Sequence, residues 1–338
     1  MKDSPLAIVG APGSPYSRKL RAVLRYRRIP HVWVQRGSRE SRSLPRPRVE
    51  LLPQLVFPGA KEALTDSSPL IRRLESLYAG RSVIPDDPAL AFLDALLEDY
   101  ADEWLTKAMF HYRWAFPADV AQAAAILPRW FEIDQPEAEA VAAGKQFAER
   151  QIARLGVVGS NPTTAATIEA SYRRLLERLD ARLAESPCVF GARPAASDFG
   201  LYGQLTQLVG FDPTPRSVAL ETAPRVVAWV DVIEDLSGHE PGDADWIARD
   251  ALPDSLRGLF GEVGRVYPPF LLANADALAR GAERVECTVD GRPWVQKPFP
   301  YQGKCLVWLR EAHAALASSD RRVVDAFLAG TGCEALFA

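Results

Sequence analysis

The first residues that could carry chemistry are a serine and a proline near the start of the chain. Ser14 and Pro15 open the segment SPYSRKLRAVLRYRR, whose apolar residues repeat at helical spacing. Serine is a good N-cap and proline is favoured at the first helical position, so a structural role alone would explain both residues. A hydroxyl at this point also faces the unpaired N–H groups and the positive end of the helix dipole. It can therefore stabilise a thiolate that a ligand brings there, and the two roles are compatible.

Two further pairs of residues have the same double interpretation. Leu52 and Pro53 precede an apolar run, so the proline can simply begin a strand, or it can be a cis-proline that exposes the backbone of Leu52 to a peptide ligand. Asp66 and Ser67 precede another segment of helical periodicity, where either residue can cap the helix. The same helix start can instead bind a ligand carboxylate through backbone N–H groups and a hydroxyl.

Apolar patterning places these three pairs on one unit of strands and helices. Short apolar runs bounded by Gly and Pro predict strands, and apolar residues at i, i+4 and i+7 predict helices with one buried face. The first strand, the first helix and the second strand form a parallel unit with a right-handed crossover. The expected order is strand 5–10, helix 14–28, strand 31–35, loop 36–48, strand 53–57, strand 63–65 and helix 66–78.

The rest of the chain divides into a helical part and a different tail. From Ala89 onward, apolar stripes predict helices. Residues 283–298 alternate in hydropathy around Asp290-Gly291, a dipeptide that favours a tight hairpin turn, and a helix is expected at 303–317. We therefore expect three units, at residues 1–80, 86–240 and 252–338.

Composition limits the functions that the chain can have. The 338 residues are 48% hydrophobic and 25% charged, which is ordinary for a globular protein, and no apolar run approaches the roughly 20 residues that span a bilayer. The four cysteines are far apart and form no CxxC pair, which fits a reducing, cytoplasmic environment. Neither cysteines nor histidines show metal-ligand spacing, and no nucleotide-binding loop is present. We therefore expect a cytoplasmic protein with no bound metal and no membrane association.

Charge is unevenly distributed along the sequence. Residues 1–50 hold twelve Lys and Arg against three acids, a net charge of +9, although the whole chain carries −3. Residues 85–103 hold seven acids and no Lys or Arg. The basic start favours an anionic ligand or an acidic protein surface. Nucleic acid is not expected as a partner, because no base-stacking aromatics alternate with the arginines and the whole chain is acidic.

Taken together, the order and spacing of the motifs resemble the glutathione transferase family. The chain is similar to the family's Ser/Cys-Pro helix start, its Val-Pro-x-Leu loop, its Glu/Asp-Ser helix start and a signature in which an Asp begins a core helix of the second domain. The resemblance covers roughly residues 5–236. It implies an α/β thioredoxin-like N-terminal domain followed by an all-α C-terminal domain, with residues 252–338 as a small α+β extension beyond the common family length. The similar segments are SPYSRKLRAVL (14–24), LLPQL (51–55), Asp66 with the SSPLIRRLE that follows it (67–75), and FGARPAASDFGLYGQL (190–205).

The resemblance also implies an activity. Glutathione would be the co-substrate, and its thiolate would attack a small electrophile. Ser14 would be the catalytic residue, because its hydroxyl would donate a hydrogen bond to the sulfur and lower the thiol pKa. Leu52 and Pro53 would hold the cysteinyl backbone of glutathione, and Asp66 and Ser67 would hold its γ-glutamyl end.

A second-substrate pocket is expected at the end of the long helix of the second domain, because that helix borders this pocket in the family. The segment AMFHYRWA mixes aromatic, histidine and arginine side chains, and most residues of this kind at such a position belong to the core. The candidates for the pocket are Phe110, His111, Arg113 and Tyr202.

An alternative function is a non-catalytic binding or scaffold protein with the same fold. Ala195 stands where the family usually has a Ser or Thr cap, although Ser197 or Asp198 could replace that cap. The long tail and the uneven charge distribution also favour a non-catalytic protein. Thiol–disulfide exchange is disfavoured, because position 14 is Ser and the first domain has no cysteine.

The resemblance and the charge distribution together predict a homodimer. In the family, the first domain of one subunit meets the long helices of the other, so the basic residues 1–50 and the acidic residues 85–103 would face each other twice. We also expect residues 252–338 to pack on the body of the protein. A lone hairpin is marginal in water, and four aromatic residues here carry too much area to leave exposed: Trp294, Phe299, Tyr301 and Trp308.

Overall fold

The N-terminal part is built on a mixed four-stranded sheet, in a computed structural model that describes residues 4–338. The strand order is β2-β1-β3-β4, with β1 parallel to β2 and with β3 antiparallel to both of its neighbours. Ile8 of β1 is paired with Trp33 on one side and with Leu55 on the other. The strands are β1 (Leu6–Gly10), β2 (His31–Gln35), β3 (Gln54–Val56) and β4 (Leu64–Thr65).

Three helices complete this part: α1 (Pro15–Tyr26), α2 (Arg39–Ser43) and α3 (Ser67–Leu77). The first helix begins where the sequence predicts it, because the Ser14 hydroxyl accepts a hydrogen bond from the N–H of Ser17 at 3.3 Å. The order of strands and long helices confirms the predicted thioredoxin-like domain, whereas α2 forms within a segment that we expected to be a loop.

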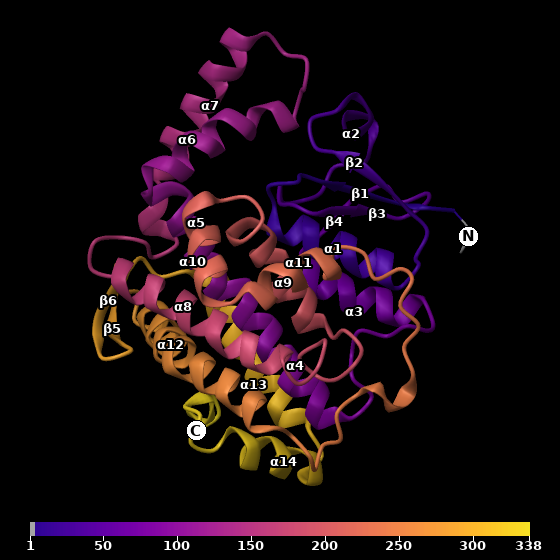
Figure 1. Ribbon diagram of the computed structural model, residues 1–338, viewed down its shortest axis with the longest axis vertical. Coiled ribbons are helices and arrows are strands. Elements are labelled where there is room, and N and C mark those ends of the chain that lie inside the picture. The colour runs from indigo at the N-terminus through magenta and orange to yellow at the C-terminus, as the bar shows by residue number, and fades with distance from the viewer. Residues whose placement is uncertain (1–3) are drawn as a thin grey trace.

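The remainder of residues 4–338 is mostly helical, as predicted. In Figure 1, α6 and α7 form a hairpin that projects beyond the rest of the body, and α4, α8, α9 and α12 pack together at its centre. The elements are α4 (Pro88–Tyr100), η1 (Ala101–Leu105), α5 (Thr106–Ala115), α6 (Pro117–Ile126), η2 (Pro128–Trp130), α7 (Glu137–Ile152), η3 (Leu155–Val157), α8 (Ala165–Leu183), α9 (Ala196–Leu208), α10 (Pro213–Thr222), α11 (Pro224–Ile233) and η4 (Asp243–Asp245).

The missing cap at the start of α9 is replaced by a carboxylate. The Asp198 side chain accepts hydrogen bonds from the backbone N–H of Ala195 at 2.8 Å and of Val189 at 2.9 Å. The first-turn N–H of Ser197, which a Ser or Thr at position 195 could cap, donates instead to Oδ1 of Asp94 in α4 at 2.8 Å. The acceptor that replaces the missing cap is therefore Asp94, whereas Asp198, one of the two residues that the sequence suggested, binds the N–H of Ala195 itself.

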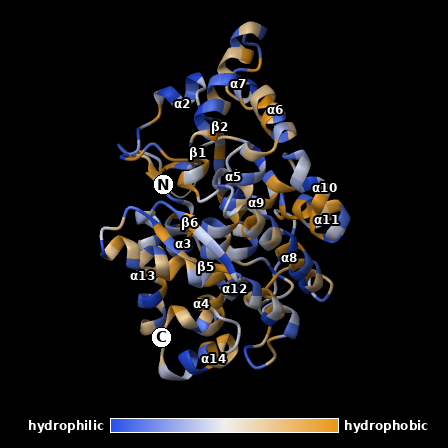
Figure 2. Cartoon of the chain, turned by 90° about the vertical axis from the view of Figure 1, so that its left-hand side faces the viewer, coloured by the Kyte–Doolittle hydropathy of each residue, from blue (hydrophilic) through white to orange (hydrophobic). Residues whose placement is uncertain are grey.

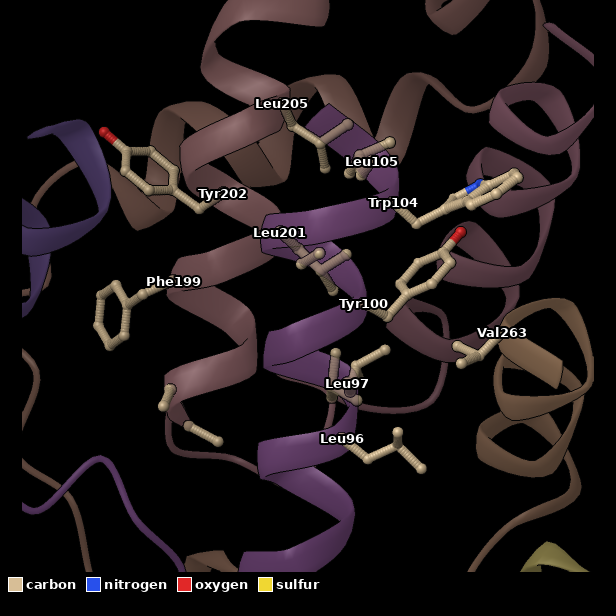
Figure 3. Packing of buried hydrophobic residues seen from close by; sticks show 14 of the residues in the cluster. Leu96, Leu97, Tyr100, Trp104, Leu105, Phe199, Leu201, Tyr202, Leu205 and Val263 are labelled. Atoms are coloured by element: carbon tan, nitrogen blue, oxygen red, sulfur yellow. The ribbon is translucent and has the colours of Figure 1, made fainter. Parts of the chain in front are cut away.

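One hydrophobic core includes residues of the N-terminal domain, the helical region and the extension, and a smaller separate cluster lies at α6 and α7. Figure 3 shows Leu201 and Leu205 of α9 facing the helix that carries Leu97, while Tyr100 and Trp104 extend from the opposite side of that helix, the side on which Val263 of α12 lies. A glycine brings the two domains close together, because a Cβ at Gly203 of α9 would lie 2.7 Å from the carbonyl oxygen of Pro15. The helix start at Ser14 is thus fixed directly against the helical body.

Residues 252–338 pack on this body, as predicted. Trp294 of the hairpin is 1% exposed and lies 5.1 Å, between ring centroids, from Trp104. Trp308 differs from the expectation, because it is 46% exposed. The elements are α12 (Asp254–Ala279), β5 (Val285–Val289), β6 (Arg292–Gln296), α13 (Pro300–Ala315), α14 (Ser318–Leu328) and η5 (Cys333–Leu336).

Two features of this extension contrast in how well the sequence predicts them. The hairpin turns at Asp290 and Gly291, both with positive φ, as the dipeptide indicates. The 26-residue helix α12 is not predicted, and it contains Pro268 and Pro269. No helix within residues 4–338 is long and apolar enough to cross a membrane.

The charge argument for a homodimer loses its basis in this structure. Asp94, Glu98, Asp102 and Glu103, four of the seven acids in residues 85–103, are buried inside the chain rather than displayed on a surface. On the basic side, three arginines of α1 converge on one carboxylate of the same chain. The pairs are Arg18–Glu234 (2.6 Å), Arg21–Glu234 (2.8 Å) and Arg25–Glu234 (2.7 Å). The homodimer stays a prediction without this support.

Candidate functional site

A cavity of about 340 Å³ lies where the N-terminal domain, the long central helix and the extension meet. One wall comes from the loop before β3 and the start of α3, a second from η1 and α5, and a third from residues just before and within the first turn of α13. Figure 2 shows α13 on the side of the molecule that carries α3 and α4. The lining residues are Tyr16, Leu51, Leu52, Asp66, Ser67, Asp102, Glu103, Thr106, Lys107, Val157, Val158, Phe299, Tyr301 and Gln302.

Three of the five residues predicted to bind glutathione open onto this cavity: Leu52, Asp66 and Ser67. The Leu52–Pro53 peptide bond is cis, one of the two alternatives for this pair, and Pro53 lies behind Leu52 without lining the cavity. Asp66 has a φ of 79° and makes no side-chain cap to α3. Its carboxylate instead accepts a hydrogen bond from the hydroxyl of Tyr301 at 2.6 Å.

Ser14 lies at the start of α1 but is not among the residues that line the cavity. Its hydroxyl caps the first turn of that helix, as described above. Tyr16, two residues further on, does reach the cavity and donates a hydrogen bond to the carbonyl oxygen of Asp102 at 2.9 Å. Burial, together with Glu103 and Asp102, raises the pKa of Tyr16 well above its usual value, so its hydroxyl remains a donor.

The second wall begins with a single π-helical turn. This turn, η1, joins α4 to α5 and contains the lining residues Asp102 and Glu103. π-Helical turns insert a residue into an α-helix and recur at functional sites, because they redirect the side chains around them. Here the turn lets two adjacent carboxyl groups lie near one cavity.

The two carboxyl groups have different surroundings. Asp102 accepts hydrogen bonds from the ammonium of Lys19 at 2.5 Å and from the hydroxyl of Ser68 at 3.0 Å. Burial raises the pKa of Asp102, and Lys19 opposes that rise. Glu103 is 8% exposed, and burial, Asp99 and Asp102 raise its pKa to about 8. These surroundings therefore favour the neutral form of Glu103.

Lys107 follows Glu103 by one helical turn and reaches the same cavity. Its ammonium donates hydrogen bonds to the Val158 carbonyl at 3.2 Å and to Gln296 Oε1 at 3.1 Å, and it lies 4.1 Å from the ring centroid of Phe270. Burial lowers the pKa of Lys107 to about 7. The extension thus supplies much of the environment of this lysine.

The four residues predicted for the second-substrate pocket do not line this cavity. His111 hydrogen-bonds through Nδ1 to Ser160 at 2.8 Å, and burial lowers its pKa. Phe110 packs in a separate, smaller apolar cluster. The other two are tied to acids: Arg113 to Asp212 at 2.8 Å, and the hydroxyl of Tyr202 to Glu234. These contacts explain the four residues as parts of the helical packing.

Sequence reasoning missed the lining residues that η1, α5 and the extension contribute. Glu103 and Lys107 are spaced i, i+4, which by itself indicates only a surface ion pair. Tyr301 lies 235 residues from Asp66 and has no local signal that connects the two. Within residues 4–338, no group of three or more His, Cys, Asp or Glu side chains is placed to hold a metal ion.

Comparison with known proteins gives one match to a family. The family described as "Glutathione S-transferase, N-terminal domain" matches residues 8–82, which span the four-stranded sheet and its helices. Residues 8–82 therefore form a domain of the glutathione S-transferase family, and the helical region that follows it agrees with that fold. No curated protein matches the sequence.

Several solved structures are similar to this chain at low identity. A glutathione S-transferase-like protein from Pseudomonas syringae is 18% identical, with 68% of this chain and 66% of that chain covered and a TM-score of 0.41. A glutathione S-transferase from Methylobacterium radiotolerans, in complex with glutathione sulfonate, is 18% identical over 72% and 95% of the two chains, with a TM-score of 0.39. The beta-etherase LigF from Sphingobium sp. strain SYK-6 is 16% identical over 70% and 96%, with a TM-score of 0.43.

Proposed function

We propose that this protein is a glutathione transferase that binds glutathione in the cavity and activates its thiol for attack on a small electrophile. The observation that carries the proposal is that Leu52, Asp66 and Ser67, from two separate loops, open onto one cavity in a domain of the glutathione S-transferase family.

Each group has a definite task in this proposal. The backbone of Leu52, presented by the bend at Pro53, pairs with the cysteinyl residue of glutathione. Ser67 and the backbone N–H groups at the start of α3 bind the γ-glutamyl carboxylate, because a helix start favours an anion. Asp66 binds the γ-glutamyl ammonium. These contacts place the cysteinyl sulfur toward the start of α1.

Ser14 and the helix start act on that sulfur. The thiolate is the reactive form of a thiol, and a helix N-terminus lowers thiol pKa values. The thiolate forms a bond to an electrophilic carbon of the second substrate, and the leaving group departs with the electron pair of the bond that breaks. Leu51, Val157, Val158 and Phe299 offer an apolar surface for a small second substrate.

The test follows the ultraviolet absorbance of the thiolate of bound glutathione across pH. We expect the bound thiol to titrate below free glutathione in the wild type, and about one pKa unit higher in Ser14→Ala than in the wild type, equivalent to roughly 1.4 kcal/mol. Ser38→Ala is the matched control, because Ser38 caps α2 through the N–H of Ser41 at 3.2 Å, away from the cavity. Identical titrations in all three proteins would leave Ser14 as a helix cap.

A second candidate function is glutathione binding without turnover. It is favoured by the position of Ser14, whose hydroxyl is engaged with the first turn of α1 and does not line the cavity. Such a protein would bind glutathione without lowering its thiol pKa in the wild type. The same titration therefore separates the two functions.

A further inference from the structure

The start of α13 is joined to the proposed glutathione site by one hydrogen bond. The hydroxyl of Tyr301 donates to Oδ2 of Asp66 at 2.6 Å, and both residues line the cavity. Burial and Asp66 raise the pKa of Tyr301, so this hydroxyl stays protonated and remains a donor. An element of the extension therefore determines where one oxygen of the Asp66 carboxylate lies.

The segment that carries Tyr301 is held in place from two sides. The side chain of Asn274, buried in α12, donates to the carbonyl of Phe299 at 3.1 Å and accepts from its N–H at 2.8 Å. Gln302 donates from Nε2 to the backbone carbonyl of Glu103 at 3.1 Å. Tyr301 thus lies between Phe299 and Gln302, which are both held by hydrogen bonds to other elements. The packing of the extension therefore fixes the position of Tyr301.

The space beside Tyr301 remains large with this segment in place. The cavity has a volume of about 340 Å³ with Tyr301 bonded to Asp66, so the tyrosine forms a wall and does not fill the site. Its hydrogen bond uses Oδ2 of the carboxylate. Within residues 4–338, Oδ1 of Asp66 accepts no hydrogen bond, so it is available to a ligand.

We propose that Tyr301 is a positioning residue of the ligand site, which holds the Asp66 carboxylate so that its other oxygen receives the ammonium group of the γ-glutamyl moiety. The proposal rests on the proposed function. It makes residues 252–338 a part of the glutathione site, a role that the resemblance does not assign to them. It also assigns a specificity, because only a ligand with an amino group benefits from the oriented carboxylate.

The chain offers a matched control for this hydrogen bond. Tyr267 of α12 donates to Oδ2 of Asp99 at 2.6 Å, so it also joins the extension to the body through a tyrosine and an aspartate. Tyr267 does not line the cavity. Each of the variants Tyr301→Phe and Tyr267→Phe therefore removes one tyrosine–aspartate hydrogen bond of 2.6 Å. The bond of Tyr301 lies at the cavity, and the bond of Tyr267 lies outside it.

The experiment is a calorimetric titration of the full chain with two ligands. One is reduced glutathione, and the other is its analogue in which hydrogen replaces the γ-glutamyl amino group. We expect Tyr301→Phe to raise the Kd for glutathione roughly 3–10-fold and to change the Kd for the analogue less than about twofold, because one hydrogen bond to a charged group is lost. Tyr267→Phe should leave the ratio of the two Kd values as in the wild type.

Three results would overturn the inference. If the ratio of the Kd for the analogue to the Kd for glutathione is the same in Tyr301→Phe as in the wild type, the hydrogen bond between Tyr301 and Asp66 has only a structural role. Tighter binding of glutathione by Tyr301→Phe would show that the tyrosine competes with the ligand for Asp66. Absence of glutathione binding by the wild type would remove the proposed function together with this inference, whereas the first two results remove the inference alone.

Discussion

Lys19 of α1 and Glu98 of α4 form an ion pair with 2.7 Å between Nζ and Oε1, and their side chains are only 1% and 2% exposed. Burial alone would lower the pKa of Lys19, but Asp102 and Glu98 raise it above its usual value. Arg72 of α3 donates to the other oxygen of Glu98 at 2.6 Å. The pair therefore joins the N-terminal domain to α4, which continues into the η1 and α5 segments that form one wall of the cavity.

Replacing this lysine by an uncharged residue of similar length should strongly destabilise the protein. Lys19→Met removes the cation that pairs with the buried carboxylate of Asp102 and leaves Glu98 with Arg72 alone, and breaking a buried ion pair typically costs about 3–5 kcal/mol of the free energy of unfolding. Lys61→Met is the control, because Lys61 is exposed and its change should stay within about 0.5 kcal/mol. Chemical denaturation measures both values. Equal stabilities for the two variants would contradict a structural role for the ion pair.

The raised pKa of Glu103 predicts a pH-dependent stability. Its pKa of about 8 in the folded state lies above the ordinary value near 4.3, so its contribution to stability is complete below that ordinary value and is lost as the pH rises through about 8. Glu103→Gln cannot ionise. We expect the variant and the wild type to melt at similar temperatures near pH 5, and the variant to melt several degrees higher at pH 8.5.

The comparison removes the effect of other buried carboxyl groups, because Asp94 and Asp99, whose pKa values burial raises to about 7, titrate in both proteins. Glu286→Gln on the exposed face of the hairpin is the control and should follow the wild type at every pH. Parallel melting curves for wild type and Glu103→Gln between pH 5 and 8.5 would mean that Glu103 has an ordinary pKa.

Two tryptophans of the extension should differ sharply in their effect on stability. Trp294 is buried against Trp104 and Phe270, so Trp294→Ala should cost about 3–5 kcal/mol through lost burial and the cavity left behind. Trp308 is nearly half exposed, and Trp308→Ala should cost less than about 1 kcal/mol. Urea unfolding measures both. A Trp294→Ala protein as stable as the wild type would show that the hairpin does not support the body.

The elements predicted well are those whose ends are marked by capping or turn residues in the local sequence. Ser14 caps α1, and Asp290-Gly291 turns the hairpin, because each feature depends only on its immediate neighbours. The helix α12 escapes prediction because Pro268 and Pro269 usually end a helix, and here tertiary packing retains them within it. Local rules therefore account for much of the first domain and for less of the extension.

The candidate site shows the same limit. Leu52, Asp66 and Ser67 come from motifs that can be read in the sequence, whereas Glu103 and Lys107 belong to a segment whose charges suggest a solvated surface. That interpretation also led to the charge argument for a homodimer, which fails because burial depends on distant partners such as Lys19. The mass of the protein at micromolar concentration in moderate salt decides the oligomeric state.

The most direct test of the proposed function is the melting temperature of the full chain as a function of reduced glutathione concentration. A ligand that binds only the folded state raises the free energy of unfolding by RT ln(1 + [L]/Kd). This is about 2.7 kcal/mol when the free ligand concentration is 100 times Kd. We predict that the melting temperature of the wild type rises steadily with the logarithm of glutathione concentration. Asp66→Asn should require roughly 10-fold more glutathione for the same rise, and Asp134→Asn, at an exposed position, should match the wild type. A wild-type melting temperature that does not change up to millimolar glutathione would contradict the proposal.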